Sequence, residues 1–157
     1  MVIRIHWKEL LISLALVYGV AGLSALLTMG SMETYGSLER PPLSPPGFVF
    51  PLVWAVLFTL MGVSAYLVYH KLEDKSRFPY WIYGAQLFFN FIWPLLFFNL
   101  GAYLPSLVWL VVLWLLILAM ILAFYRISRP AGLLQIPYLA WVAFAGYLNA
   151  GVWLLNG

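Results

Sequence analysis

Cysteine is absent from the 157-residue chain, and charged residues are scarce. Without cysteine there are no disulfides, no thiol catalysis and no thiolate metal sites. Asp, Glu, Lys and Arg together make up 8% of the residues, against about 25% in an average soluble domain. So few charges exclude a disordered chain and argue against a soluble enzyme with a polar cleft. The eight Lys and Arg residues are dispersed, so nothing indicates a basic patch that would bind nucleic acid.

The few charges that are present leave long neutral stretches between them, at 10–32, 41–70, 78–125 and 130–157. A membrane-spanning helix needs about 20 mostly apolar residues. The stretch 78–125 is more than twice that length, and it holds the helix breakers Gly101 and Pro105 near its middle. The sequence therefore predicts an all-α membrane protein, a single domain over 1–157. Its five transmembrane helices are expected at about 9–29, 47–70, 79–99, 104–126 and 131–154.

The basic residues are distributed unevenly over the two ends of such a bundle. One end would carry all of them except Arg40, namely Arg4, Lys8, Lys71, Lys75, Arg77, Arg126 and Arg129. The positive-inside rule places this end in the cytoplasm. We therefore expect a multi-pass protein of the cell membrane with a cytoplasmic N-terminus.

The predicted spans also lack Asp, Glu, Lys and Arg. Intramembrane ionisable groups mark proton relays and ion pathways, so their absence argues against an ion-coupled transporter. The groups that general acid–base catalysis needs are missing as well. His6 and His70 lie near helix ends, where an interfacial histidine is the preferred interpretation because zinc-type ligand spacing is missing. We expect no metal site and no required cofactor.

Aromatic residues are abundant, with 8 Trp, 10 Tyr and 11 Phe. Many lie near predicted helix ends, as in the aromatic belts of membrane interfaces; these are Trp7, Tyr80, Trp81, Tyr103 and Trp153. Trp54, Trp93 and Trp141 differ, because each lies inside a span, with proline nearby and small or polar neighbours. These three are candidates for contact with a ligand.

The third predicted helix carries Gln86, Asn90 and Trp93 on one face, because their spacing follows the helical repeat. Two interpretations stay open. The amides could form hydrogen bonds with neighbouring helices, or they could face a ligand. Pro94 removes one backbone hydrogen bond and is expected to bend the helix, which favours a cavity.

Small residues mark two other helices. Ala145 and Gly146 would let a helix or a flat ligand come close, and helix packing is the preferred interpretation. Packing is preferred still more strongly for the first helix, which has small residues at Ala15, Gly19, Gly22 and Ala25.

The connection 30–46 is the only long one, and four prolines stiffen it. It could act as a lid over the outer end of the bundle or as a rigid turn that sets the second helix. A space lined by Trp, Phe and Asn and closed by such a loop suits a large, flat, apolar ligand with one or two polar edges.

Residues 35–46 and 51–54 form a first string in two parts, YGSLERPPLSPP and PLVW. Residues 84–98 form a second, GAQLFFNFIWPLLFF, and residues 137–149 a third, PYLAWVAFAGYLN. The three strings resemble, in order, the first loop with the second helix, the third helix and the fifth helix of the translocator protein family. Members of this family are also called tryptophan-rich sensory proteins or peripheral benzodiazepine receptors.

The resemblance implies a five-helix bundle, often a homodimer, that binds porphyrins and other hydrophobic ligands such as benzodiazepine-type drugs beneath the first loop. It also implies the pocket residues. They are Trp54, Asn90, Trp93, Trp141, Ala145 and Leu148, with Phe50 at an upper position and Tyr35 in the covering loop. We add Gln86 because it shares the face of Asn90.

The leading hypothesis is a membrane receptor or sensor for tetrapyrroles such as protoporphyrin or haem, with a role in transport or stress signalling. The alternative is a light- and oxygen-dependent enzyme that degrades porphyrin, with Trp54 and Trp141 as the residues involved. A third hypothesis is a structural protein whose aromatic residues only pack.

The chain departs from the family pattern at two places. Leu43 stands where the family often has Trp, so we expect a looser lid. Residues 150–154 lack the Tyr and the basic residue of sterol-binding members, which makes sterol binding doubtful and favours a bacterial-type member.

Overall fold

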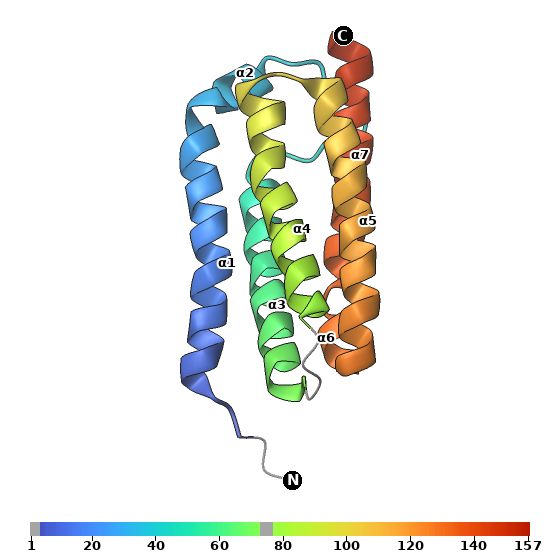
Figure 1. Ribbon diagram of the computed structural model, residues 1–157. Helices are drawn as coiled ribbons and strands as arrows, with labels where there is room; N and C mark the ends of the chain where they lie inside the picture. Colours follow the sequence, from blue (N-terminus) through green and yellow to red (C-terminus); the bar gives the residue numbers. More distant parts are fainter. Residues whose placement is uncertain (1–3, 73–76) are drawn as a thin grey trace.

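Five long helices stand side by side in the computed structural model, which describes residues 4–72 and 77–157, with Met32 described by its backbone alone (Figure 1). They are α1 (Trp7–Thr28), α3 (Val49–Lys71), α4 (Phe78–Pro94), α5 (Tyr103–Ile127) and α7 (Ile136–Asn156). With the short helical segments that adjoin three of them, all five are long and apolar enough to cross a membrane. The prediction of an all-α bundle of five transmembrane helices is confirmed.

Four short elements lie between the long helices. The connection after α1 holds a 3₁₀ turn at Met29–Ser31 and the helix α2 (Met32–Gly36), so the start of the 30–46 loop is helical. A π-helical turn, η2 (Leu95–Asn99), extends α4. The fifth predicted helix is divided, because α6 (Arg129–Leu133) ends before α7 begins.

Prolines explain several of these boundaries. Pro79, Pro130 and Pro137 lie in the first turns of α4, α6 and α7. A backbone N–H in a first turn has no acceptor within the helix, so proline, which lacks this N–H, costs no hydrogen bond there. Pro94 lies at the end of α4, and the chain beyond it widens into the π turn. There the backbone N–H of Leu100 donates to the carbonyl of Leu95 at 3.1 Å, a five-residue span. The irregularity expected after Pro94 is therefore a π turn.

The solid core lies toward the end of the bundle where α3 and α5 finish. Met61, Leu113, Ile117 and Met120 are almost completely buried there. On the outer surface large apolar side chains are exposed, as a lipid-facing surface requires; examples are Leu11, Ile12, Leu16, Val108, Leu115 and Leu122.

Two glycines hold this closed end together. A Cβ on Gly62 would lie 2.7 Å from a methyl carbon of Leu14, so Gly62 lets α1 lie close to α3. A Cβ on Gly132 would lie 2.8 Å from the Cα of Tyr125, so Gly132 lets α6 fold back against α5. The close packing expected of Gly19 and Gly22 is wrong for the part of the chain that the structure describes, because a Cβ on either would meet no described atom within 4 Å.

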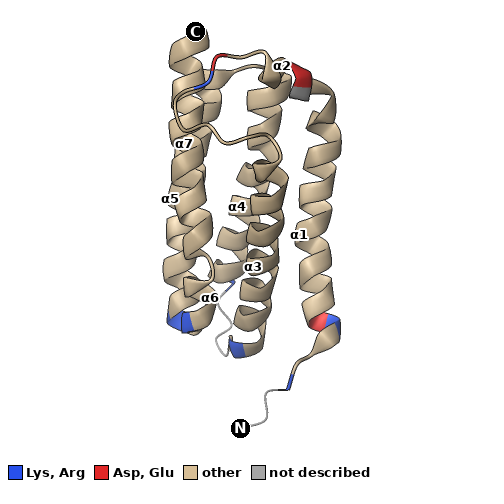
Figure 2. Ribbon diagram, turned by 180° about the vertical axis from the view of Figure 1, so that it is seen from behind, with Lys and Arg blue, Asp and Glu red and all other residues tan. Residues whose placement is uncertain are grey.

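Charged residues gather at the two ends of the bundle (Figure 2). Arg4, Lys8, Lys71, Arg77, Arg126 and Arg129 lie at the closed end, where α1 begins and α3 and α5 finish. Arg40 lies at the other end with Glu33 and Glu39, and Lys75 is outside the described residues. The uneven distribution of basic residues expected from the sequence is present in the described part of the chain.

Candidate functional site

A cavity of about 820 Å³ opens beneath the segment 37–48, between α1, α3, α4 and α7. Its volume falls within the range of sites that hold small molecules. All the residues expected at the site line it except Gln86. They are Tyr35, Phe50, Trp54, Asn90, Trp93, Trp141, Ala145 and Leu148.

Aromatic rings form most of the wall. Trp93 stacks on Phe97, with ring centroids 5.2 Å apart and planes at 25°. Across the cavity Phe50 meets Trp141 edge to face at 5.9 Å, and Trp54 packs on the ring of Phe58 at 5.7 Å. These pairs hold the rings in fixed orientations, so they offer a ligand a preformed aromatic surface.

A buried hydrogen-bond network forms the floor of the cavity. The amide nitrogen of Asn90 donates to the hydroxyl of Tyr138 at 2.7 Å, and this hydroxyl donates to Gln86 Oε1 at 2.8 Å. Gln86 is completely buried and does not line the cavity, so for Gln86 the structure favours the interhelical interpretation. Asn90 fits both interpretations, because it forms a hydrogen bond to Tyr138 on α7 and also lines the cavity. Its own carbonyl oxygen takes no hydrogen bond within the described residues.

A second network fixes Trp93. Its indole N–H donates to Asn149 Oδ1 at 3.0 Å, and the hydroxyl of Ser106 donates to the same oxygen at 3.0 Å. The amide of Asn149 donates to the carbonyl of Tyr103 at 2.8 Å. The indole N–H of Trp93 is therefore already occupied and is not available to a ligand.

The other two tryptophans keep their donors free. Neither Trp54 nor Trp141 donates an indole hydrogen bond to any residue in the described ranges, and the N–H of Trp141 is buried. A buried donor without a partner is costly, so an acceptor on a bound molecule would relieve that cost. The free donors of the site are therefore on α3 and α7.

Two residues of the covered end line the cavity, Tyr35 from α2 and Arg40 from the segment 37–48. The ring of Tyr35 packs edge to face against Phe98 at 5.4 Å and against Phe50 at 6.3 Å. The Arg40 guanidinium lies 5.5 Å from the centre of the same ring. Burial raises the pKa of the Tyr35 hydroxyl, and nearby Arg40 partly opposes the rise. Arg40 is the one charged residue among the described residues that line the cavity.

The segment is fastened to α7. The side chain of Asn156 bonds to both backbone groups of Glu39, at 3.1 Å and 2.7 Å. The hydroxyl of Tyr147 donates to the carbonyl of Pro42 at 2.6 Å. Pro41 is buried against Gly151, where a Cβ would lie only 2.3 Å from the proline ring. The segment is thus a cover docked on α7.

Leu43 has no part in the cavity. Its side chain is 83% exposed and does not line the site, and the looser lid expected from Leu43 stays a prediction. Its φ of 70° lies in the left-handed region, which leucine rarely adopts.

The sequence argument missed the contribution of α1. One face of this helix forms a wall of the cavity, through Tyr18, Ala21, Gly22, Ser24, Ala25 and Thr28. Small residues interleaved with Ser and Thr on one helix face were the available signal. We interpreted them as a packing surface because the same pattern is typical of helix contacts.

The lining has few groups that could do acid–base chemistry. No Asp, Glu, His or Lys of the described ranges contributes to it. The arrangement suits binding by stacking and burial, with a few fixed polar contacts.

Five helices able to cross a membrane, four of which enclose this aromatic cavity, define a polytopic membrane protein with an internal cavity. Similarity to known proteins agrees with that class. The profile of the TspO/MBR family matches residues 11–154. The chain belongs to this family.

Individual relatives match over most of their length. The chain is 38% identical to the "Tryptophan-rich protein TspO" of Chlorobaculum tepidum over 149 residues, which is 94% of each chain. It is 36% identical to the "Translocator protein" of Bos taurus, covering 85% of this chain and 82% of that one. It is 35% identical to the "Tryptophan-rich sensory protein" of Cereibacter sphaeroides, covering 98% and 94%. The resemblance inferred from the three strings is confirmed.

Proposed function

We propose that this protein is a membrane receptor or sensor that binds a tetrapyrrole such as protoporphyrin in the cavity. The single observation that carries the proposal is the arrangement of Trp54, Trp93 and Trp141 around one preformed space of about 820 Å³. A flat aromatic macrocycle would bury large apolar faces against these rings and gain stacking energy from them. The relatives' names, which include translocator and sensory protein, agree with a role in ligand sensing or transfer.

The polar groups suit the edges of such a ligand. The carbonyl oxygen of Asn90 would accept from a ring N–H, and the free indole donors of Trp54 and Trp141 would meet acceptors. Arg40, at the covered end, would pair with a carboxylate of the macrocycle. Because Arg40 is exposed, this pair would add only about 0.2–1 kcal/mol. Affinity would then come mainly from the rings and orientation from the polar contacts.

The experiment is a titration of the purified full chain in detergent with protoporphyrin, followed through the porphyrin Soret band so that removing tryptophans does not alter the signal. A Trp54→Leu/Trp141→Leu variant is expected to bind about 10-fold more weakly, because each aromatic contact is worth about 0.5–1.5 kcal/mol. The matched control is Trp7→Leu/Trp81→Leu, whose side chains are 62% and 74% exposed. Equal affinity for all three proteins contradicts the proposed site.

The carboxylate contact has its own test. Arg40→Gln is expected to weaken binding of the free acid about two- to fivefold, the size of an exposed ion pair. Binding of the porphyrin dimethyl ester should not change, because the ester has no charge to lose. An equal effect on both ligands would mean that Arg40 acts through the cover and not through a carboxylate.

A light- and oxygen-dependent enzyme is the second candidate, favoured by the unbonded indole N–H groups of Trp54 and Trp141 at the same cavity. It predicts that illumination in air destroys the bound porphyrin faster than free porphyrin in the same detergent and yields a discrete product. Equal bleaching rates reject it. The scarcity of acid–base groups in the lining makes binding the better-supported function.

The remaining expectations stay predictions. We infer a homodimer in the cell membrane with the closed end in the cytoplasm, on the basis of the family and the Lys and Arg distribution. Mass measurement in detergent and cysteine accessibility at introduced sites check these two points. Sterol binding remains doubtful because residues 150–154 lack the expected Tyr and basic residue, and Gly151 instead packs against the cover.

A further inference from the structure

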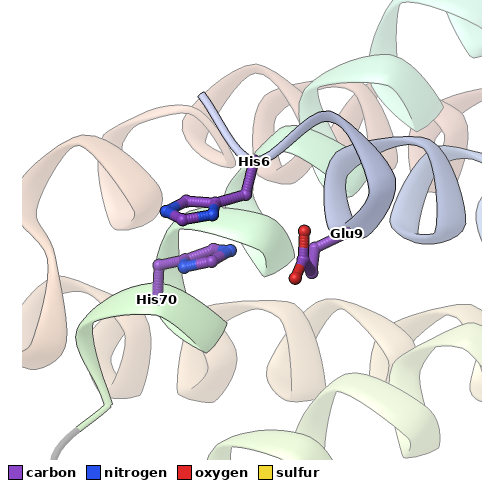
Figure 3. Close-up of side chains that lie close together, drawn as sticks. All are labelled: His6, Glu9 and His70. Atoms are coloured by element: carbon purple, nitrogen blue, oxygen red, sulfur yellow. The ribbon is translucent and has the colours of Figure 1, made fainter. Parts of the chain in front are cut away.

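A cluster of metal-ligand side chains lies at the closed end of the bundle, far from the cavity (Figure 3). His6 precedes α1 and Glu9 lies in its first turn, three residues further on. His70 comes from the last turn of α3. One ligand atom from each residue can be chosen so that all three lie within 4.8 Å of one another. The sequence argument treated the two histidines separately, so it missed both Glu9 and the approach of α3.

The local structure holds these three residues in place. The two imidazole rings stack with centroids 4.4 Å apart and planes at 15°. The backbone N–H of His6 donates to the hydroxyl of Tyr66 at 2.8 Å, and the ring of Tyr66 lies 4.6 Å from that of His70. Tyr66 therefore fixes the start of α1 beside the last turn of α3. His6 and His70 are exposed and Glu9 is half-buried, so an ion could reach all three.

Two imidazole nitrogens and one carboxylate oxygen are the ligand set of an open zinc-type site, with a water molecule as the fourth ligand. Bonds of about 2.0–2.1 Å in a tetrahedron place donor atoms about 3.4 Å apart. In the structure the ligand atoms lie within 4.8 Å of one another, and rotation about the soft last torsion of each histidine would bring them closer to this separation.

We propose that His6, Glu9 and His70 bind one divalent transition-metal ion of the zinc class, which fastens the start of α1 to the end of α3. The same α1 forms a wall of the cavity at its other end, through residues such as Tyr18 and Thr28. The ion would therefore keep α1, and with it this wall, in a fixed position relative to α3. Gly62 already brings the two helices close.

The test is titration of the full chain, prepared without a polyhistidine tag, with Zn²⁺ by calorimetry and with Co²⁺ by visible absorption. We expect one ion per chain and a Co²⁺ spectrum of four- or five-coordinate geometry. His70→Gln and Glu9→Gln should each weaken binding by at least about 10-fold, since even loss of an outer-shell partner costs roughly 10–100-fold. Zn²⁺ should also raise the melting temperature of the wild type and not that of His70→Gln.

Glu33→Gln is the matched control, because Glu33 also lies in the first turn of a helix but at the opposite end. It should bind the ion as the wild type does. The proposal is overturned if the wild type binds no more Co²⁺ than a His6→Gln/His70→Gln variant. It is equally overturned if Glu33→Gln loses as much affinity as Glu9→Gln. Because the changed side chains lie at the surface, circular dichroism is expected to show unchanged helix content in every variant.

Discussion

The two halves of the bundle are built from the same five helices, yet one is solid and the other is hollow. In the closed half, Gly62 and Gly132 bring neighbouring segments so close that a single methyl group would clash. In the cavity half, Gly22 on α1 has nothing within 4 Å of where its Cβ would be, and aromatic rings line the open space. A glycine in a membrane helix therefore does not by itself indicate close packing. The residues opposite the glycine determine whether the helices come close there.

The boundary between the halves is polar. The network of Gln86, Asn90 and Tyr138 crosses the bundle where the cavity ends and the core begins. Irregular backbone is found in the cavity half, where the π turn follows Pro94 and where Leu43 has a positive φ. The hollow half therefore keeps its shape through hydrogen bonds and a docked cover, and the closed half through contact between helices. Four changes test this comparison, in order of expected effect.

Gly132→Ala should have the largest effect. The added methyl group would lie 2.7 Å from the Cβ of Tyr125 and 2.8 and 2.9 Å from its backbone Cα and N, and none of these atoms can turn aside as the far end of a flexible side chain can. We expect a loss of about 3 kcal/mol, the upper end for overpacking, seen as a lower melting temperature in detergent. Gly22→Ala is the control from the hollow half and should be neutral or slightly stabilising. Similar losses for the two variants would remove the distinction between the halves.

Tyr138→Phe should come second. Removing the hydroxyl leaves the buried Gln86 oxygen without its donor, at a cost of about 1–2 kcal/mol. Tyr83→Phe makes the same chemical change at a buried hydroxyl that has no hydrogen-bond partner, so it should be neutral or stabilising. Thermal melting of the two variants against the wild type gives the comparison. Equal destabilisation would mean that the polar floor contributes nothing beyond burial.

Asn156→Ala should loosen the cover with a smaller effect on the fold. The variant loses two hydrogen bonds to the backbone of Glu39, and because both are exposed and water can replace them, the loss of stability should be about 0.5–1 kcal/mol in total. Because these bonds hold the segment over the cavity, bound porphyrin should leave several-fold faster, measured by stopped-flow dilution. Asn99→Ala is the control, because it loses hydrogen bonds from η2 to α1 and to the 3₁₀ turn Met29–Ser31, outside the cover. An unchanged release rate for Asn156→Ala would mean that the ligand leaves by another route.

Leu43→Gly should give the smallest change, a gain of about 0.5 kcal/mol. The left-handed backbone costs leucine about 1–2 kcal/mol, and the greater freedom of glycine in the unfolded chain offsets part of the relief. Leu43→Ala is the control, because alanine keeps the Cβ that causes the strain and should bring no gain. The melting temperatures of both variants decide the point. A gain for alanine equal to that for glycine would trace the effect to the exposed side chain.

The sequence predicted the number of spans, their ends to within a few residues for four of the five, and the tryptophans that surround the cavity. Hydropathy and charge suffice to locate the spans, because the thickness of the bilayer sets about the same length for every membrane-spanning helix. The interruption at 134–135 was not predictable, because it depends on the contact of Gly132 with Tyr125. The different roles of Gln86 and Asn90 were not predictable either, because the two residues share one face of α4 and only Asn90 lines the cavity. The histidine cluster brings together His6 and His70, which are 64 positions apart in the sequence, a contact that spacing on one helix cannot show.

One carboxamide joins the cavity wall to the far side of the bundle. The oxygen of Asn149 accepts from the indole of Trp93 and from the hydroxyl of Ser106, while its nitrogen holds the carbonyl of Tyr103. A ligand that displaced the Trp93 indole would either lengthen its hydrogen bond to Asn149 or move the Asn149 carboxamide with it. In the second case the strain passes to the turn between η2 and α5. A bound molecule that displaced the Trp93 indole would therefore also pull on this turn, through the side chain of Asn149.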